Sequence, residues 1–286
     1  MSAAGGSPRR DAPLGVFDSG LGGLTVVRAL RAALPDEDIV YLGDTARVPY
    51  GTKGAGTVTR YALGCAGHLV SKGVKAIVIA CNTVSAVAPE RLRVELDLPV
   101  LGVIEPGARA AAAATRVFKV GVLATAGTIA SGAYTRALAA CSTRIEAYGQ
   151  AAPLFVPLAE EGWTEGEVPT LAARRYLEPL AKAGVDVVIL GCTHYPLLFD
   201  VIEREAKAMI GPNVTILDSA SVVAREVASF LRERDLLRER GAEAERDDVA
   251  RRGTTHLFVT DVPKTFEETA ARFLGEHAGA AEQIDL

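Results

Sequence analysis

The sequence predicts an α/β protein built from two similar, doubly wound parallel-sheet domains that are related by pseudo-symmetry, with an active site in the cleft between them. Apolar runs of strand length alternate with helix-like segments along most of the chain, and this alternation is typical of a parallel sheet. The order of the elements also repeats, so that Gly15 corresponds to Gly121 and Cys81 to Cys192 at similar offsets. We interpret this repeat as a duplication that produced two matching halves.

The first half is expected to alternate strands and helices from residue 14 onward. Each expected strand is a short run rich in β-branched residues, and each expected helix is a longer segment that carries apolar residues at helical spacing. In chain order we expect a strand at 15–17, a helix at 21–33, a strand at 39–42, a helix at 58–71, a strand at 75–80, a helix at 84–95 and a strand at 100–103.

The second half repeats this order and is followed by three further elements. In the second half we expect a strand at 119–123, a helix at 128–140, a strand at 144–148, two helices within 154–183, a strand at 185–190, a helix at 195–210 and a strand at 214–217. The three further elements are a helix to about 237, a strand at 255–260 and a helix at 266–274. Because an isolated strand leaves its backbone groups unpaired, the strand at 255–260 should return to the first domain.

These assignments divide the chain into a tail and two domains. Residues 1–13 are rich in Ala, Gly, Ser, Pro and Arg without apolar periodicity, which predicts a disordered tail. Residues 14–104 plus 218–286 are predicted to form the first α/β domain, and residues 105–217 the second. Residues 238–252 carry both signs of charge and few apolar side chains, so we expect a solvated helix or a loose insertion there.

Length and composition indicate a soluble, globular and cytoplasmic protein. The 286 residues are 49% hydrophobic, which is ample for buried cores. The net charge of −4 is mild and both signs are mixed along the chain, so no nucleic-acid surface is evident. Every long apolar run stops well before the roughly 20 residues that span a bilayer, and the start of the chain lacks a hydrophobic signal core, so no membrane partner is expected.

The four cysteines fall into two groups. Four thiols in a chain of this length fit a reducing compartment. Cys65 and Cys141 lie in helix-like segments among Ala and Leu, and we expect both to be buried core residues. Cys81 and Cys192 each end a β-branched run and precede hydroxyl, amide or imidazole groups. Two thiols at matching strand ends can face each other across a cleft, and two opposed acid/base groups are the minimal machinery for inverting a stereocentre.

Each of these two cysteines stands where a helix is expected to begin. A helix N-terminus favours the thiolate and lowers the pKa of a thiol from about 8.5. Each thiol could therefore act as a base when ionised and as an acid when protonated. His194 follows Cys192 by two residues, and Asp18 ends a strand in the same half as Cys81, so each could assist one proton transfer.

The glycine-rich turn from Asp18 to Gly23 is a candidate ligand-binding loop. A strand, a glycine-rich turn and a helix N-terminus together make an anion site. The turn lacks the spacing of dinucleotide or P-loop motifs, however, and an Asp at the strand end would repel a phosphate. A carboxylate or amine ligand fits better, with Ser19 and backbone amides binding an anion and Asp18 binding an ammonium group.

Two other chemistries use the same types of side chain. Cys81, Cys192 and His194 could ligate zinc, but no Cys-x-x-Cys or His-x-x-x-His pair supports a metal site, so a mechanism without metal or cofactor is favoured. A Cys/His nucleophile pair for acyl transfer is the other enzymatic option. That option leaves the second cysteine unexplained.

Five motifs in this chain match a known family. They are GVFDSGLGG at 15–23, GDTARVPYG at 43–51, ACNT at 80–83, ATAGTI at 124–129 and LGCTHYPL at 190–197. On these motifs the chain resembles the glutamate racemases of the cofactor-independent aspartate/glutamate racemase superfamily, from about residue 14 to residue 274. The resemblance implies interconversion of L- and D-glutamate by a homodimer, with no pyridoxal phosphate, to supply D-glutamate for peptidoglycan synthesis.

The resemblance also implies roles for individual residues. Cys81 and Cys192 would be the two acid/base thiols, one on each face of the α-carbon. Asp18 and His194 would assist their respective proton transfers. Hydroxyl, amide and backbone N–H groups would hold the carboxylates and the amine of the substrate, at Asp18, Ser19, Tyr50, Gly51, Asn82, Thr83, Thr125, Thr128, Thr193 and His194.

Three alternatives remain open from the sequence. A sister activity, such as aspartate racemisation, would use the same motifs on a shorter substrate. A non-catalytic binding protein is the alternative from another class, and the intact cysteines in both halves argue against it. Glu160 or Glu161 could lie near the mouth of the cleft, but we favour a place on an exposed helix face.

Overall fold

Within the residues that the structure describes, the first sheet has six parallel strands. The computed structural model describes residues 10–238, 253–262 and 265–286. In spatial order β10-β9-β2-β1-β3-β4, the strands are β10 (Ala281–Gln283), β9 (Thr255–Val259), β2 (Ile39–Gly43), β1 (Leu14–Asp18), β3 (Ala76–Ile79) and β4 (Val100–Gly102). The strand expected at 255–260 thus joins the first sheet, since β9 pairs with β2 along its length.

The second sheet, in the described part of the chain, has four parallel strands in a matching order. They are β6 (Glu146–Ala151), β5 (Lys119–Ala124), β7 (Val187–Gly191) and β8 (Thr215–Asp218). The spatial order β6-β5-β7-β8 is the order β2-β1-β3-β4 of the first sheet, with each strand replaced by its counterpart in the second half. The predicted fold of two similar, doubly wound parallel sheets is confirmed.

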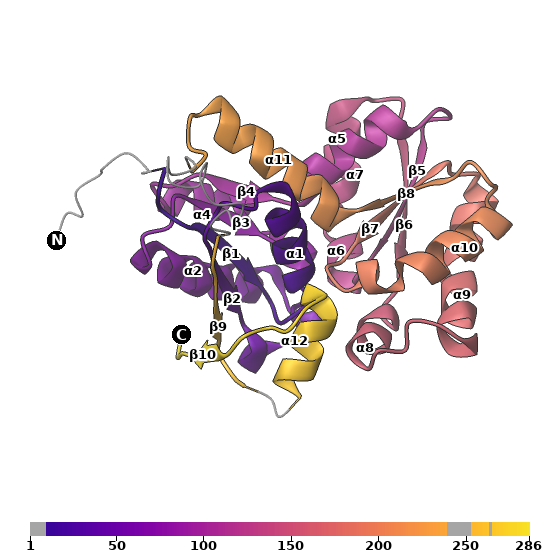
Figure 1. Ribbon diagram of the computed structural model, residues 1–286. Coiled ribbons are helices and arrows are strands. Elements are labelled where there is room, and N and C mark those ends of the chain that lie inside the picture. The colour runs from indigo at the N-terminus through magenta and orange to yellow at the C-terminus, as the bar shows by residue number, and fades with distance from the viewer. Residues whose placement is uncertain (1–9, 239–252, 263–264) are drawn as a thin grey trace, which may run out of the picture.

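Helices cover both faces of both sheets (Figure 1). In chain order the α-helices are α1 (Leu24–Ala33), α2 (Ala55–Ser71), α3 (Asn82–Ser85), α4 (Pro89–Glu95), α5 (Ile104–Ala114), α6 (Ala126–Ala130), α7 (Ala133–Cys141), α8 (Phe155–Glu160), α9 (Glu167–Ala183), α10 (Phe199–Met209), α11 (Ser219–Glu233) and α12 (Phe266–Leu274). Short 3₁₀ helices lie at η1 (Thr45–Arg47), η2 (Tyr50–Thr52) and η3 (Tyr195–Leu198).

The largest hydrophobic core is shared between the two halves. Val16 of β1, Val122 of β5 and Val223 of α11 all belong to it, so the inner faces of both sheets pack onto a common layer of helices. Helices α1, α5, α7, α11 and α12 contribute to this layer (Figure 1). Two smaller cores lie under the outer faces of the sheets. Burial on both faces explains why the strands read as continuous apolar runs.

Several predicted helices are interrupted for local reasons. The helix expected at 84–95 is divided into α3 and α4, because Pro89 begins a new helix. The helix expected at 128–140 is divided at Gly132, whose φ of 66° lies in the left-handed region. The helix expected at 195–210 begins as the 3₁₀ turn η3 and continues as α10.

A buried ion pair fastens the start of the described chain to the first sheet. Lys75 Nζ lies 2.5 Å from Glu37 Oε2 and also donates to the carbonyl oxygens of Arg10 and Leu236. Both charged side chains are almost fully buried. Residues 10–13, assigned by composition to the tail, therefore contact the folded protein. Residues 1–9 and 239–252, including most of the predicted charged insertion, lie outside the described residues.

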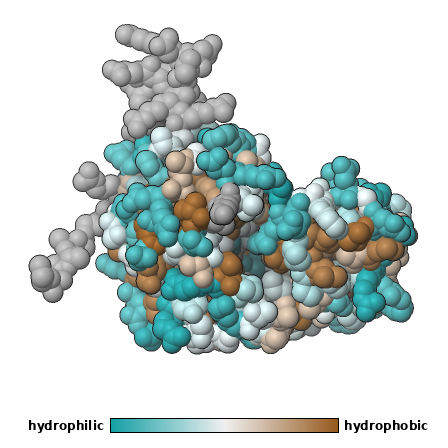
Figure 2. Space-filling model, turned by 90° about the horizontal axis from the view of Figure 1, so that it is seen from below, coloured by the Kyte–Doolittle hydropathy of each residue, from teal (hydrophilic) through white to brown (hydrophobic). Residues whose placement is uncertain are grey.

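The molecule has a larger and a smaller lobe when it is viewed from below (Figure 2). The larger lobe contains the first sheet and the smaller one the second sheet (Figures 1 and 2). On this face, hydrophobic residues occur as separate patches between hydrophilic ones. No helix in the described part of the chain combines the length and the apolar character needed to cross a membrane.

Candidate active site

A cavity of about 280 Å³ lies between the two halves, at the carboxyl ends of their strands. This is the edge where open parallel sheets bind their ligands. The cavity is lined by Ser19, Gly20, Val48, Pro49, Tyr50, Gly51, Thr52, Cys81, Asn82, Thr83, Thr125, Ala126, Pro153, Val156, Pro157, Glu160, Cys192, Thr193 and His194. Ten of the twelve predicted site residues are in this set. Asp18 and Thr128 are the two that lie behind the lining.

Cys81 reaches the cavity from the first sheet. It follows β3 by two residues and is the N-cap of α3. Its Sγ lies 3.6 Å from the Ser19 hydroxyl. Burial raises the pKa of Cys81 to about 12, and the charge of Asp18 adds to this rise. The expectation that the helix N-terminus would favour the thiolate is therefore wrong for Cys81: α3 has only four residues, and its effect is smaller than the cost of burying a charge.

Asp18 lies behind Cys81 at the end of β1. Its side chain is almost fully buried, and Oδ2 accepts a hydrogen bond of 3.2 Å from the backbone N–H of Gly20. Burial raises the pKa of Asp18, although the nearby His194 and three backbone N–H groups oppose that rise. Oδ1 has no hydrogen-bond partner among the described residues. A buried carboxyl group with a raised pKa and an open acceptor is suited to proton exchange.

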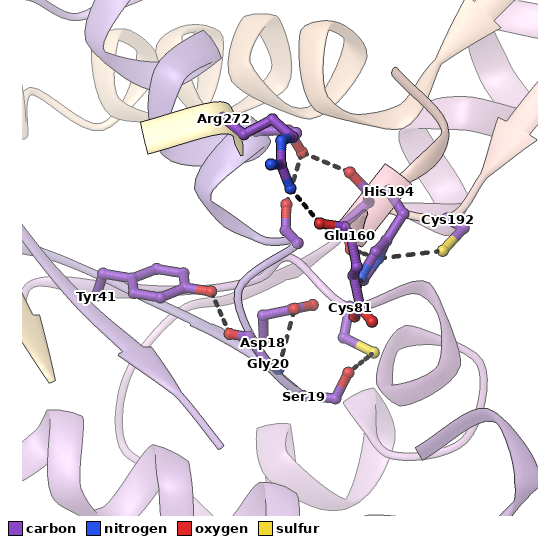
Figure 3. A network of polar contacts seen from close by, with 12 residues as sticks. Asp18, Ser19, Gly20, Tyr41, Cys81, Glu160, Cys192, His194 and Arg272 are labelled. Atoms are coloured by element: carbon purple, nitrogen blue, oxygen red, sulfur yellow. Dashed lines mark hydrogen bonds and ion pairs between the residues drawn. The ribbon is translucent and has the colours of Figure 1, made fainter. Parts of the chain in front are cut away.

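Cys192 and His194 form a pair on the opposite wall (Figure 3). Cys192 follows β7 directly, and its Sγ lies 3.7 Å from His194 Nδ1. The other ring nitrogen, Nε2, lies 3.0 Å from Glu160 Oε1. Burial alone would lower the pKa of His194, but the hydrogen bonds to Cys192 and Glu160 outweigh it and raise the pKa to about 10. The imidazole is thus held between a thiol and a carboxylate and retains its proton at neutral pH.

Glu160 is a site residue that sequence reasoning placed wrongly. Its side chain is about half exposed at the end of α8, yet it lines the cavity and bonds His194. Helix α12, near the C-terminus, supports this pair. Arg272 donates to the backbone carbonyl of Glu160 (Figure 3), and Phe273 makes an edge contact with the His194 ring. The favoured placement of Glu160 on an exposed helix face is therefore corrected.

Glu160→Gln is expected to lower the pKa of His194, because it removes the carboxylate next to Nε2. The pKa of about 10 lies above the ordinary 6.5, so the stabilisation that comes from protonation is complete below pH 6.5 and is lost as the pH rises through about 10. Where activity requires protonated His194, the alkaline limb of kcat/KM should move to lower pH in the variant. NMR titration of the imidazole and a pH–rate profile measure both shifts.

Glu161→Gln is the matched control for this change. Glu161 is exposed and adjacent in sequence, and it is not part of the cavity wall. The Glu161→Gln substitution should leave the pKa of His194 unchanged. The same His194 titration in Glu160→Gln and in the parent protein would contradict the assignment of Glu160 as the group that raises this pKa.

Three threonine hydroxyls from the two halves meet beside the cavity. Thr83 Oγ1 lies 3.1 Å from Thr125 Oγ1 and 3.3 Å from Thr128 Oγ1. Thr125 is also the N-cap of α6 and accepts a hydrogen bond from the Thr128 backbone N–H. Because hydroxyl groups both donate and accept, this cluster can exchange its mutual hydrogen bonds for bonds to a carboxylate.

Tyr50 lines the cavity, but its hydroxyl is engaged within the protein. The hydroxyl bonds the buried carboxylate of Asp44, which also accepts from Arg47 Nε at 2.7 Å and from the Thr260 hydroxyl at 2.8 Å. A Cβ built on the next residue, Gly51, would lie 3.0 Å from Thr125 across the cleft. The absence of a side chain there lets the two halves approach.

The Asn82 side chain is likewise engaged within the protein. Its Oδ1 accepts a hydrogen bond of 2.7 Å from the Tyr134 hydroxyl, and its Nδ2 lies 3.2 Å from Ser219 Oγ. On the other wall, the carbonyl oxygen of Thr193 accepts from the Thr25 hydroxyl at 2.9 Å. Ser19 and Thr193 both line the cavity, and their hydroxyl groups lie 3.6 Å from Cys81 Sγ and 3.4 Å from His194 Nδ1, respectively.

Sequence reasoning missed an apolar part of the wall. Pro153, Val156 and Pro157, at the start of α8, face the cavity. The local sequence offered little signal for them: Val156 and Pro157 fall in the segment expected to be helical at 154–183, and Pro153 directly precedes it. Cys141 is a second correction outside the site, because it is exposed at the end of α7, whereas Cys65 is buried as expected.

The zinc alternative has no ligand cluster to support it. Within residues 10–238, 253–262 and 265–286, no group of three or more His, Cys, Asp or Glu side chains is placed to hold a metal ion. The chemistry available in the cavity is proton transfer by two thiols on opposite walls. Two parallel-sheet domains that present one thiol each to a shared cavity define an isomerase of the racemase class.

Comparisons with known proteins agree with this class. The Asp/Glu/Hydantoin racemase family matches residues 24–227. The glutamate racemase of Geobacter metallireducens is 52% identical over 273 residues, which cover 96% of each chain. The chain therefore belongs to the Asp/Glu/Hydantoin racemase family.

Solved structures show the same fold. Glutamate racemase from Thermus thermophilus, in complex with β-chloro-D-alanine, is 46% identical with a TM-score of 0.83 and covers 97% of this chain and 98% of its own. Glutamate racemase from Francisella tularensis, in complex with D-glutamate, is 35% identical with a TM-score of 0.85 and covers 96% of this chain and 98% of its own.

Proposed function

We propose that this protein interconverts L- and D-glutamate by a two-base mechanism without a cofactor, and so supplies D-glutamate for peptidoglycan synthesis. The observation that carries the proposal is the placement of Cys81 and Cys192, from equivalent strand ends of two matching sheets, on one cavity. Each thiol addresses one face of the substrate α-carbon.

In one direction, a thiolate removes the α-proton and becomes a thiol, while the opposite thiol donates its proton to the other face and becomes a thiolate. The C–H bond that breaks and the C–H bond that forms lie on opposite faces, so the configuration inverts and no net proton is consumed. Cys81, whose pKa is raised by burial, rests as the thiol. His194 holds a proton 3.7 Å from Cys192 and can exchange it with that sulfur.

The weak acidity of the α-carbon is the main barrier to this reaction. Removing the proton moves charge onto the α-carboxylate, which donors in the cavity must stabilise. The hydroxyls of Ser19, Thr83, Thr125 and Thr193 and the backbone N–H of Gly51 are the donors proposed for this task. Preorganised donors of this type are worth about 2.7–4 kcal/mol each.

Glutamate is proposed over a shorter amino acid on two grounds. The Geobacter relative is named a glutamate racemase, and the Francisella structure is in complex with D-glutamate. The apolar surface of Pro153, Val156 and Pro157 can pack against the side-chain methylene groups, which a shorter substrate would cover less completely.

Deuterium exchange tests the proposal directly. The purified protein is incubated with L-glutamate in D₂O without added cofactor, and α-deuteration and loss of optical rotation are followed. We expect both, with deuterium in the D-glutamate that forms. L-Aspartate in the same assay should react at least about tenfold more slowly, since a missing methylene costs about 1–3 kcal/mol. Folded protein that leaves L-glutamate unchanged would refute the proposal.

Three further expectations stay predictions. The domain boundaries at 14–104 plus 218–286 and at 105–217 are proposed to coincide with two rigid units. A homodimer is proposed from the family resemblance, and a cytoplasmic location is proposed from the short apolar runs and the four cysteines of the chain. Light scattering of the purified protein and fractionation of cells test the last two.

A further inference from the structure

Tyr134 of α7 contacts the residues next to both cysteines. Its hydroxyl donates a hydrogen bond of 2.7 Å to Asn82 Oδ1, and Asn82 directly follows Cys81. Its ring packs on Gly191, which directly precedes Cys192: a Cβ built on Gly191 would lie 3.0 Å from Tyr134 Cε2. One side chain therefore spans the two turns that present the thiols.

A second route joins the same two turns. Asn82 Nδ2 lies 3.2 Å from Ser219 Oγ at the start of α11. Ser219 Oγ in turn donates a hydrogen bond of 3.1 Å to the carbonyl oxygen of Leu190, two residues before Cys192. Both ends of the Asn82 amide are thus tied to the turn of the opposite half, one through Tyr134 and the other through Ser219.

Tyr134, Asn82 and Ser219 together form a bridge between the two turns, and this bridge is buried and uncharged. Tyr134 is 3% exposed, Asn82 2% and Ser219 1%. Burial raises the pKa of Tyr134, with a smaller contribution from the charge of Cys192, so its hydroxyl stays protonated and remains a donor. A buried acceptor that loses its donor destabilises the protein, because no water molecule replaces the lost hydrogen bond. The bridge therefore holds one arrangement of the two turns.

We propose that Tyr134 is a positioning residue, which sets the separation and direction of the Cys81 and Cys192 thiols through Asn82 and Gly191. This inference rests on the proposed two-base racemisation. Under this proposal the Asn82 side chain holds the two turns in place, and only its backbone is available to the substrate.

The alignment of the two thiols decides whether the deprotonated substrate is reprotonated with inversion or with retention. When both thiols are aligned, the carbanion-like state is protonated by the thiol opposite the one that removed the proton, which gives inversion. When the opposite thiol is displaced, the first thiol exchanges its proton with solvent and returns a deuteron to the same face. Misalignment therefore raises exchange with retention relative to inversion.

Tyr134→Phe tests this, because it removes the hydroxyl and keeps the ring on Gly191. In D₂O with L-glutamate, we expect kcat for inversion to fall about tenfold, KM to stay within about twofold, and the ratio of deuterated L-glutamate to D-glutamate at early times to rise several-fold. Tyr176→Phe is the matched control. Tyr176 is also buried, and its hydroxyl accepts from the Leu154 backbone N–H within the second half alone, so its exchange ratio should equal that of the parent protein.

The outcomes separate this inference from the proposed function. A parent protein that fails to racemise glutamate overturns the function, whereas an active parent and a Tyr134→Phe variant with the same kcat and exchange ratio overturn the positioning role. A fall of exchange and inversion in equal proportion also overturns it, since that is the result of lost structure. If Tyr134→Phe does not fold, Ser219→Ala breaks the second route and must give the same rise in the exchange ratio.

Discussion

Replacing either Cys81 or Cys192 with serine is expected to lower kcat/KM for racemisation by about 10²–10⁴-fold in both directions, the range that one acid/base group contributes. Each thiol is the base in one direction and the acid in the other, so the loss of one blocks both. A serine hydroxyl fits the same space but ionises far less readily. Circular dichroism with each glutamate enantiomer as substrate measures the two directions separately.

Cys141→Ser serves as the control for these variants. It makes the same atomic change at a cysteine that is exposed at the end of α7 and is not part of the cavity wall. Its kcat/KM should match that of the parent protein. Full racemisation by Cys81→Ser or by Cys192→Ser would rule out the two-base scheme.

Replacing Lys75 with methionine is expected to lower the free energy of unfolding by about 3–5 kcal/mol, the cost of leaving one partner of a buried ion pair without the other. Lys75 and Glu37 lie 2.5 Å apart, with side chains that are 0% and 2% exposed. The variant also removes the donor to the carbonyls of Arg10 and Leu236. Urea unfolding followed by tryptophan fluorescence and by circular dichroism measures the loss.

Lys182→Met gives the comparison at the surface. Lys182 and Glu178 also form an ion pair, at 2.7 Å, but their side chains are 75% and 57% exposed. This variant should change stability far less than Lys75→Met, because solvent screens an exposed ion pair. Adding Glu37→Leu to Lys75→Met should recover part of the loss, since it removes the unpaired charge. A Lys75→Met protein as stable as Lys182→Met would contradict the assignment of the buried pair as a stabilising contact.

Local patterns were sufficient to predict most of the fold. The strands that lie inside the sheets are apolar, β-branched runs, so their positions followed from composition and length. The predicted helix at 266–274 coincides with α12. Helix α5 was missed because Pro106 and Gly107 stand near its start, and a Pro-Gly pair ordinarily marks a turn. Strand β10 was missed because it is short and largely exposed, and only its pairing with β9 makes it a strand.

In the candidate site, too, the features set by local sequence were predicted and those set by distant segments were not. Residues that follow strand ends, such as Cys81 and Cys192, were found because a parallel sheet presents those positions at one edge. Glu160 was misplaced because its partner, His194, is 34 residues away in sequence. The pKa of Cys81 was misjudged for a related reason: a helix start is visible in the sequence, whereas burial depends on segments that come from elsewhere in the chain.

The pairing of β2 with β9 has a consequence for protein synthesis on the ribosome. Asp44, just after β2, and Thr260, just after β9, are 216 residues apart in sequence. All four strands of the second sheet are translated before β9, and the edge of β2 stays unpaired during that time. Unpaired strand edges can form incorrect pairings. Asp44 also receives the Tyr50 hydroxyl. The cavity wall that carries Tyr50 therefore gains its full support late, after the second half of the molecule has had time to fold.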